Sequence, residues 1–343
     1  MEANTSVITL EHISKRYGGI TALDGISLEV PKGCLYGLLG PNGAGKTTAL
    51  RILCTLLAPD QGRVVIAGVD ALADPRGARQ QLGYVAQEVA IDKILSGREL
   101  LELQASLYHL SAARARERIA MLTALLGMDE WLDRRCGSYS GGMRRRLDLA
   151  SGLLHNPAVL VLDEPTVGLD IESRAALWDV LQQLREQGTT ILLSSHYLEE
   201  VDALADRLAI LDRGSVIAEG TPAELKRELG GDRITLRVRE FASHDEAQKV
   251  QQLVQGLKGV SQVLINRAQG HAINFVIEAE GSEALLQLRQ QLDAAEVPVF
   301  SLAQSRPSLD DVYLQATGRT LMDAELAAVS SRDPKAEKKQ AMR

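Results

Sequence analysis

The sequence is poor in three features that would place it in other classes of protein. No apolar run approaches the ~20 residues that a membrane-spanning helix requires. Aromatic residues make up only 3% of the 343 residues, and 45 acidic residues stand against 38 basic ones. The composition therefore favours neither base stacking nor the release of counterions from phosphates, the two main sources of affinity for nucleic acids. We expect a soluble chain that does not bind nucleic acid.

Cysteine is also scarce, and its placement indicates the compartment. Cys34, Cys54 and Cys136 share no metal-binding spacing, and three cysteines cannot all be paired, as is typical of reduced cytosolic thiols. The first four residues do not begin a charged-then-apolar secretion signal. The sequence thus predicts a cytoplasmic protein.

A glycine-rich segment follows the apolar run of residues 34–39 and precedes a helix-like stretch, so that it has the strand, loop and helix context of a phosphate-binding loop. Glycines let backbone N–H groups surround phosphate oxygens at a helix N-terminus. Within this loop, Lys46 can reach the β and γ phosphates, and the Thr47 hydroxyl can ligate Mg²⁺. The predicted nucleotide-binding residues are Gly40, Pro41, Asn42, Gly43, Ala44, Gly45, Lys46, Thr47 and Thr48.

Two adjacent acidic residues are candidates for the metal ligand and the general base, which a phosphate-binding loop by itself does not provide. Residues 159–162 are apolar and indicate a buried strand, and Asp163 and Glu164 follow at its C-terminal end, where α/β sheets place their ligand sites. Asp163 is therefore the expected metal ligand, and Glu164 the expected general base for the attacking water. The pair predicts hydrolysis of the bound nucleotide.

A second anion site is expected where Ser140, Gly141 and Gly142 precede the amphipathic stretch 143–154. The serine hydroxyl and free backbone N–H groups would lie at that helix N-terminus. The basic run of residues 144–146 follows, and we interpret it mainly as a solvated or interdomain face.

With these three segments in order, the sequence resembles the ATP-binding cassette (ABC) ATPases. The resemblance implies ATP and Mg²⁺ as cofactors, and a head-to-tail homodimer (or a heterodimer with a second cassette) in which Ser140 contacts the γ-phosphate held by the opposite protomer. It also implies a role for four further residues. Gln87 would contact the metal or the attacking water, His196 would hydrogen-bond the γ-phosphate, Asp170 would lie in the dimer interface, and Tyr17 would stack on adenine.

The resemblance covers about residues 6–229, and a Gly-Gly pair at 230–231 marks a boundary. We expect an α/β fold over residues 1–229, with a RecA-like core and a helical subdomain. The βαββαβα rhythm of residues 230–318 predicts a small ferredoxin-like or related α+β domain. Residues 319–343 are expected to form a disordered tail.

Segments 83–88 and 307–314 resemble one branch of the family, the ATP-binding subunits of daunorubicin-resistance-type multidrug exporters. That resemblance implies a separate integral-membrane permease, a location on the cytoplasmic face of the cell membrane, and export of a drug-like, amphipathic or lipid substrate. We expect the permease to dock beside Gln87 and residues 88–102. An ABC importer ATPase is the main alternative, and a soluble cassette protein outside transport is the other.

Overall fold

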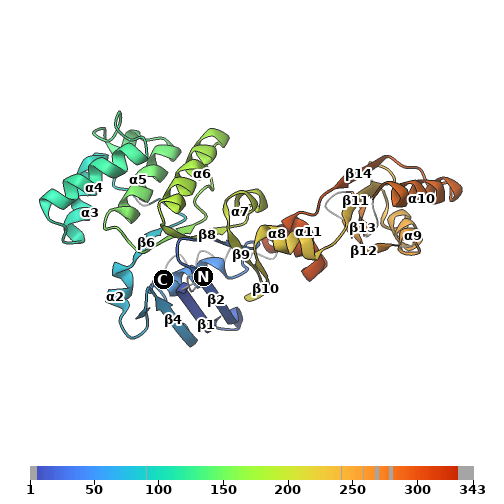
Figure 1. Cartoon of the computed structure of the whole chain (residues 1–343), viewed down its shortest axis with the longest axis horizontal. Helices are drawn as coiled ribbons and strands as arrows, with labels where there is room; N and C mark the ends of the chain where they lie inside the picture. Colours follow the sequence, from blue (N-terminus) through green and yellow to red (C-terminus); the bar gives the residue numbers. More distant parts are fainter. Residues whose placement is uncertain are drawn as a thin grey trace. The chain divides into compact units, whose positions relative to one another are not determined.

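The computed structural model describes residues 6–89, 91–240, 242–257, 259–266, 270–277 and 281–330 (Figure 1). The chain divides into two compact units, Met1–Val216 and Ile217–Arg343. No helix in these ranges is both long and apolar enough to cross a bilayer.

A six-stranded sheet has the order β10-β9-β3-β8-β7-β6, and its strands β9 to β6 form the centre of the first unit. The five strands from β9 to β6 pair in parallel. The carboxyl ends of β3, β8, β7 and β6 therefore lie next to one another at one edge, where parallel sheets bind ligands. The strands are β3 Leu35–Leu39, β6 Leu82–Val85, β7 Val159–Asp163, β8 Thr190–Ser195, β9 Arg207–Asp212 and β10 Ser215–Gly220.

Both faces of this sheet are covered, which explains why its strands are continuously apolar. Along β7, Val159 and Val161 belong to one hydrophobic core, while Leu160 and Leu162 belong to the core on the opposite face. Figure 1 shows α3 to α6 grouped on one side of the sheet, and β1, β2 and β4 on the other.

The first core also contains an antiparallel sheet of order β2-β1-β4-β5. Its strands are β1 Ser6–Tyr17, β2 Ile20–Pro31, β4 Gln61–Ile66 and β5 Val69–Asp70. The helices of the first unit are α1 Lys46–Leu53, α2 Pro75–Gln80, α3 Gly97–Leu107, α4 Ala112–Leu125, α5 Gly141–Leu153, α6 Ile171–Glu186 and α7 Leu198–Leu204, with a 3₁₀ turn at Cys136–Ser138. The expected α/β core with a helical subdomain is confirmed.

The second unit contains an antiparallel sheet of order β12-β13-β11-β14. In chain order these strands are the second, third, first and fourth, so that β13 lies between β11 and β12 in the split βαβ arrangement of the ferredoxin-like fold. The elements are β11 Asp232–Arg237, α9 His244–Gln255, β12 Val260–Asn266, β13 Ala272–Ile277, α10 Gly281–Ala294, β14 Ser301–Ser305 and α11 Leu309–Thr317. The α+β expectation is thus confirmed in its ferredoxin-like form.

Two features differ from the expected domain plan. The expected boundary after residue 229 places helix α8, Pro222–Glu228, in the first domain, but α8 packs against α11 within the second unit. The expectation of a disordered tail from residue 319 is wrong for its first part, because α12, Leu321–Ser330, is helical and buries Leu321 and Ala324. Residues 331–343 lie outside the described residues.

Candidate nucleotide site

The predicted phosphate loop connects β3 to α1 at the carboxyl edge of the central sheet. Gly43 and Gly45 adopt left-handed φ values of +83° and +111°, which glycine reaches without steric cost. A Cβ on Gly45 would lie 2.6 Å from the Ala22 carbonyl oxygen. Lys46 is 4% exposed, and its Nζ donates to the carbonyls of Gly40 at 2.7 Å and Pro41 at 3.2 Å. The ammonium group is thereby held over the loop.

Asp163 lies at the end of β7, next to the start of α1. Its Oδ1 accepts hydrogen bonds from the hydroxyls of Ser194 at 2.6 Å and Thr47 at 3.4 Å. Asp163 is 1% exposed. Mg²⁺ prefers oxygen ligands, and in phosphate-handling sites one or two protein oxygens and the substrate phosphates complete its shell. The pair Thr47 and Asp163 fits this requirement, and no group of three His, Cys, Asp or Glu in the described part of the chain offers an alternative metal site.

Glu164 is the point where the other predicted catalytic side chains meet. Its Oε1 lies 3.4 Å from Lys46 Nζ and 3.2 Å from His196 Nδ1, and its Oε2 accepts a hydrogen bond from Gln87 Nε2 at 3.0 Å. Burial raises the pKa of this carboxyl, but His196 and Lys46 outweigh burial and hold the pKa below its usual value. The carboxylate is therefore ionised at neutral pH, as a general base must be.

The backbone of Glu164 is itself unusual. Its φ of +47° lies in the left-handed region, a conformation that costs free energy for a residue with a side chain and that is found at functional sites. Its N–H group donates to the hydroxyl and carbonyl oxygens of Ser194, at 3.0 and 3.1 Å. Ser194 therefore holds both Asp163 and Glu164. Ser194 is not among the residues predicted from the sequence, although its place at a strand end two residues before His196 is a signal.

A second residue that the sequence analysis missed lies behind His196. Glu200, on α7, is 1% exposed and accepts hydrogen bonds from Ser195 Oγ at 2.6 Å and Trp178 Nε1 at 3.2 Å. The Ser195 hydroxyl in turn accepts from the N–H of Tyr197 at 3.0 Å. The segment that carries His196 is thus held on both sides. No sequence motif marks Glu200, since an acid in the first turn of a helix is common.

The second predicted anion site lies at the N-terminal end of α5. Ser140 is exposed and caps α5, and its Oγ accepts from the N–H of Met143 at 3.2 Å. Gly142 approaches α6 so closely that a Cβ there would lie 2.6 Å from Ser173 Oγ. The exposed end of α5 leaves Ser140 and Gly141 accessible to a second molecule.

Asp170 and Tyr17 are placed at the surface. Asp170 caps α6, its Oδ1 accepts from the N–H of Ser173 at 2.7 Å, and this hydrogen bond lowers the pKa of the carboxyl. Tyr17 ends β1 and is 41% exposed, with Lys15 Nζ 5.9 Å from the centre of its ring.

The basic run after Ser140 was expected to form a solvated or interdomain face, and the solvated alternative is wrong for Arg145. This side chain is 4% exposed and donates to the carbonyls of Ala86, Asp163 and Pro165. The turn of α5 directs position 145 toward the carboxyl edge of the sheet, because α5 packs on β6.

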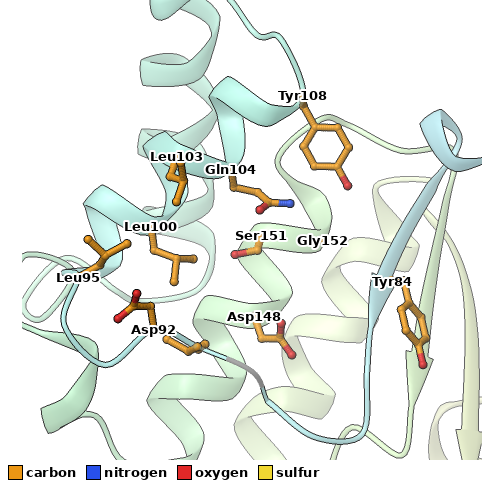
Figure 2. Close-up of a pocket in the computed structure, with 11 residues that line it drawn as sticks. Tyr84, Asp92, Leu95, Leu100, Leu103, Gln104, Tyr108, Asp148, Ser151 and Gly152 are labelled. Carbon is orange, nitrogen blue, oxygen red and sulfur yellow. The ribbon is translucent and has the colours of Figure 1, made fainter. Parts of the chain in front are cut away.

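A cavity of about 310 Å³ lies between β6, the segment 91–95, α3 and α5, and we call it the α3/α5 cavity. Figure 2 shows the aliphatic and polar side chains that surround it. Burial raises the pKa of Asp148 in its wall to about 6, although Arg145 acts in the opposite direction. The lining residues are Tyr84, Ile91, Asp92, Leu95, Leu100, Leu103, Gln104, Tyr108, Asp148, Ser151 and Gly152.

Comparison with known proteins assigns both units. Residues 23–167 match the ABC transporter family, and residues 220–317 match the C-terminal domain of DrrA1-3-like ATP-binding proteins. The chain is 43% identical to the daunorubicin resistance ATP-binding protein DrrA2 of Streptomyces coeruleorubidus, over 93% of this chain and 97% of that protein. It is 42% identical to the daunorubicin/doxorubicin resistance ATP-binding protein DrrA of Streptomyces peucetius, over 93% and 94% of the two chains. The dimeric structure of the bacterial ABC transporter cassette MJ0796 superimposes with a TM-score of 0.57 at 26% identity, covering 62% of this chain and 98% of that one.

Proposed function

The chain belongs to the ABC transporter family of ATP-binding proteins and carries the DrrA-type C-terminal domain, and from this we propose that it hydrolyses ATP to drive export of a drug-like, amphipathic or lipid compound through a separate membrane permease. The observation that carries the catalytic part is the meeting of Lys46, Gln87 and His196 at Glu164. The resistance proteins among the relatives favour export over the importer alternative.

Each residue has a role in this proposal that follows from its position. Lys46 and the backbone N–H groups of residues 40–48 bind the phosphates. Thr47 and Asp163 hold Mg²⁺, which offsets phosphate charge when it is bound. Glu164 accepts the proton of the attacking water, while His196 and Gln87 orient that carboxylate and contact the γ-phosphate or the water. Tyr17, exposed at the end of β1, stacks on the adenine ring.

We propose that two copies assemble head to tail. Ser140, Gly141 and Asp170 are exposed in the single chain, and the Ser140 end of α5 offers a hydroxyl and N–H groups to an anion. The γ-phosphate held by the phosphate loop of one copy would contact the Ser140 end of α5 in the other copy, so that each site is completed by both chains. A heterodimer with another cassette is the alternative outcome.

The permease is expected to dock at the α3/α5 cavity. Residues of the predicted docking segment 88–102 line this cavity, and so does Leu103, which is 53% exposed. Asp92 and Asp148 place acidic groups among apolar side chains there. A cytoplasmic segment of the permease that presents apolar residues and a lysine or arginine complements this lining. Such docking would keep the chain on the cytoplasmic face of the membrane.

Mixing two defective chains tests the dimer. Neither Lys46→Ala nor Ser140→Arg homodimers should bind ATP normally, but their mixture contains heterodimers with one composite site free of both changes. We expect ATP binding to return in the mixture, measured with a fluorescent nucleotide. Mixtures that bind no more ATP than either variant alone would contradict the head-to-tail arrangement.

Co-expression tests the transport function. We expect the chain to move to the membrane fraction when the permease encoded beside it is present, and the pair to lower the cellular accumulation of an amphipathic dye. Leu103→Glu should abolish this association because it places a charge on the apolar rim, whereas Leu286→Glu, also at an exposed leucine but in the second unit, should not. Sedimentation with ribosomes instead of membranes would favour the soluble-cassette alternative.

A further inference from the structure

The buried guanidinium of Arg145 joins two chain segments that carry catalytic residues. Its Nε donates to the carbonyl of Pro165 at 2.8 Å, its Nη1 to that of Ala86 at 2.5 Å, and its Nη2 to that of Asp163 at 3.2 Å. Ala86 follows β6, while Asp163 ends β7 and Pro165 lies just beyond it, more than seventy residues later in the sequence. One planar cation therefore connects two strand ends.

The three carbonyls belong to residues next to the catalytic pair. Ala86 precedes Gln87, and Asp163 and Pro165 flank Glu164. The side chains of Gln87 and Glu164 are themselves joined by the 3.0 Å hydrogen bond. The guanidinium presents its donors in a fixed plane, so that it sets the spacing of the two backbone segments as a flexible ammonium group cannot.

We infer that Arg145 is a positioning residue for ATP hydrolysis, which holds Gln87 and Glu164 in the geometry that the attacking water requires. This inference rests on the proposed role of Glu164 as the general base. Arg145 acts through the backbone of its neighbours, to whose carbonyls it donates.

Asp148 extends this arrangement to the proposed permease site. One turn along α5, its Oδ2 lies 3.5 Å from Arg145 Nη1, and its side chain also lines the α3/α5 cavity. A cation that enters the cavity competes with Arg145 for this carboxylate. An occupant of the cavity that binds Asp148 therefore alters the contacts of Arg145, which donates to the segment that carries Gln87.

Arg145→Lys tests the positioning role, because lysine keeps the charge but cannot reach all three carbonyls. Misplacing a catalytic group by about 1 Å costs about 10²-fold in rate, so we expect kcat to fall by about that factor. We expect KM for ATP to change less than about threefold, since the phosphate loop is untouched. Arg118→Lys is the matched control: Arg118 is also buried and donates to two backbone carbonyls, those of Leu153 and Leu154, but at the far end of α5. It should lower the melting temperature without lowering kcat.

A double-variant comparison separates positioning from general structural damage. If Arg145 acts through Glu164, Arg145→Lys should cause a much smaller further loss of turnover in a Glu164→Gln background, because one of the two groups that it positions has already been removed. Equal losses in both backgrounds would overturn the inference. So would a kcat within about twofold of wild type in the folded Arg145→Lys protein.

The outcomes also distinguish this inference from the function on which it rests. Near-normal turnover of Glu164→Gln alone would refute the assignment of the base, whereas normal turnover of Arg145→Lys beside an inactive Glu164→Gln would refute only the positioning role. If the lysine variant does not fold, Arg145→Gln serves in its place, since a neutral amide can still donate to a carbonyl and places no cation in the buried site. It is expected to show the same loss of kcat and the same dependence on Glu164.

Discussion

Replacing Glu164 by glutamine removes the carboxylate charge with almost no change of shape. The amide still fills the space beside Lys46 and His196, and its oxygen can still accept the hydrogen bond from Gln87. Glutamate and glutamine adopt the left-handed φ of +47° at position 164 at a similar cost in free energy. The variant therefore tests the proton-accepting role of the group more than the stability of the loop.

The expected loss of turnover follows from the role of a general base. Such a group contributes about 10²–10⁴-fold to a rate, or about 3–5 kcal/mol of transition-state stabilisation. The contacts of Glu164 with His196 and Lys46 lower the pKa of its carboxyl, so that the wild-type group is ionised at neutral pH and the full factor should be lost. ATP binding should persist, since Lys46 keeps its contacts with the carbonyls of Gly40 and Pro41.

Phosphate release at saturating MgATP measures the loss of turnover, and titration with a fluorescent nucleotide measures binding. Size-exclusion chromatography should show an ATP-dependent dimer that persists in the variant because it does not hydrolyse its nucleotide. Glu172→Gln, at an exposed acid in the first turn of α6, is the control and should behave as wild type. Turnover by Glu164→Gln within about threefold of wild type would refute the assignment of the base.

Three further predictions follow from the geometry. Gly45→Ala should weaken ATP binding far more than Gly43→Ala in the same titration, because both have left-handed φ but only a Cβ at Gly45 would lie 2.6 Å from a carbonyl, that of Ala22. Tyr139→Phe should lower the free energy of unfolding by about 1–3 kcal/mol in urea denaturation, since the buried hydroxyl donates to the turn that contains Trp131, at 2.9 Å from its carbonyl; an unchanged midpoint would contradict this. Burial raises the pKa of Asp148 from 3.8 to about 6, so its carboxyl favours the folded state most below pH 4, and this contribution is lost as the pH rises through 6. Asp148→Asn should therefore become more stable relative to wild type between pH 4 and 6, by up to about 3 kcal/mol. A difference in the free energy of unfolding that does not change with pH in urea denaturation would refute the raised pKa.

Local chemistry in the sequence determined the elements of this fold. The apolar run at residues 159–162 predicted a strand buried on both faces, and β7 alternates its side chains between two hydrophobic cores. The βαββαβα rhythm after residue 230 predicted the second unit, because strand and helix periods are properties of short segments. Helix α12 was not predicted, since it packs through two buried side chains, Leu321 and Ala324.

The phosphate loop, the acids after residue 162 and the Ser140 segment could also be identified along the chain, because each motif follows a strand or begins a helix. Their convergence could not. The sheet order β3-β8-β7-β6 brings Lys46, His196, Glu164 and Gln87 to one edge, and strand order depends on contacts between residues far apart in the sequence. The ferredoxin-like order of the second sheet was decided in the same way.

Arg145 shows most clearly what only the tertiary structure decides. In the sequence it is the middle of three consecutive arginines, and charge alone predicts a solvated face. In the structure it is buried and donates to the carbonyls of Ala86, Asp163 and Pro165. Backbone carbonyls are the same at every position and leave no trace in the sequence. A guanidinium that binds them can therefore be recognised only when the fold has brought the loops together.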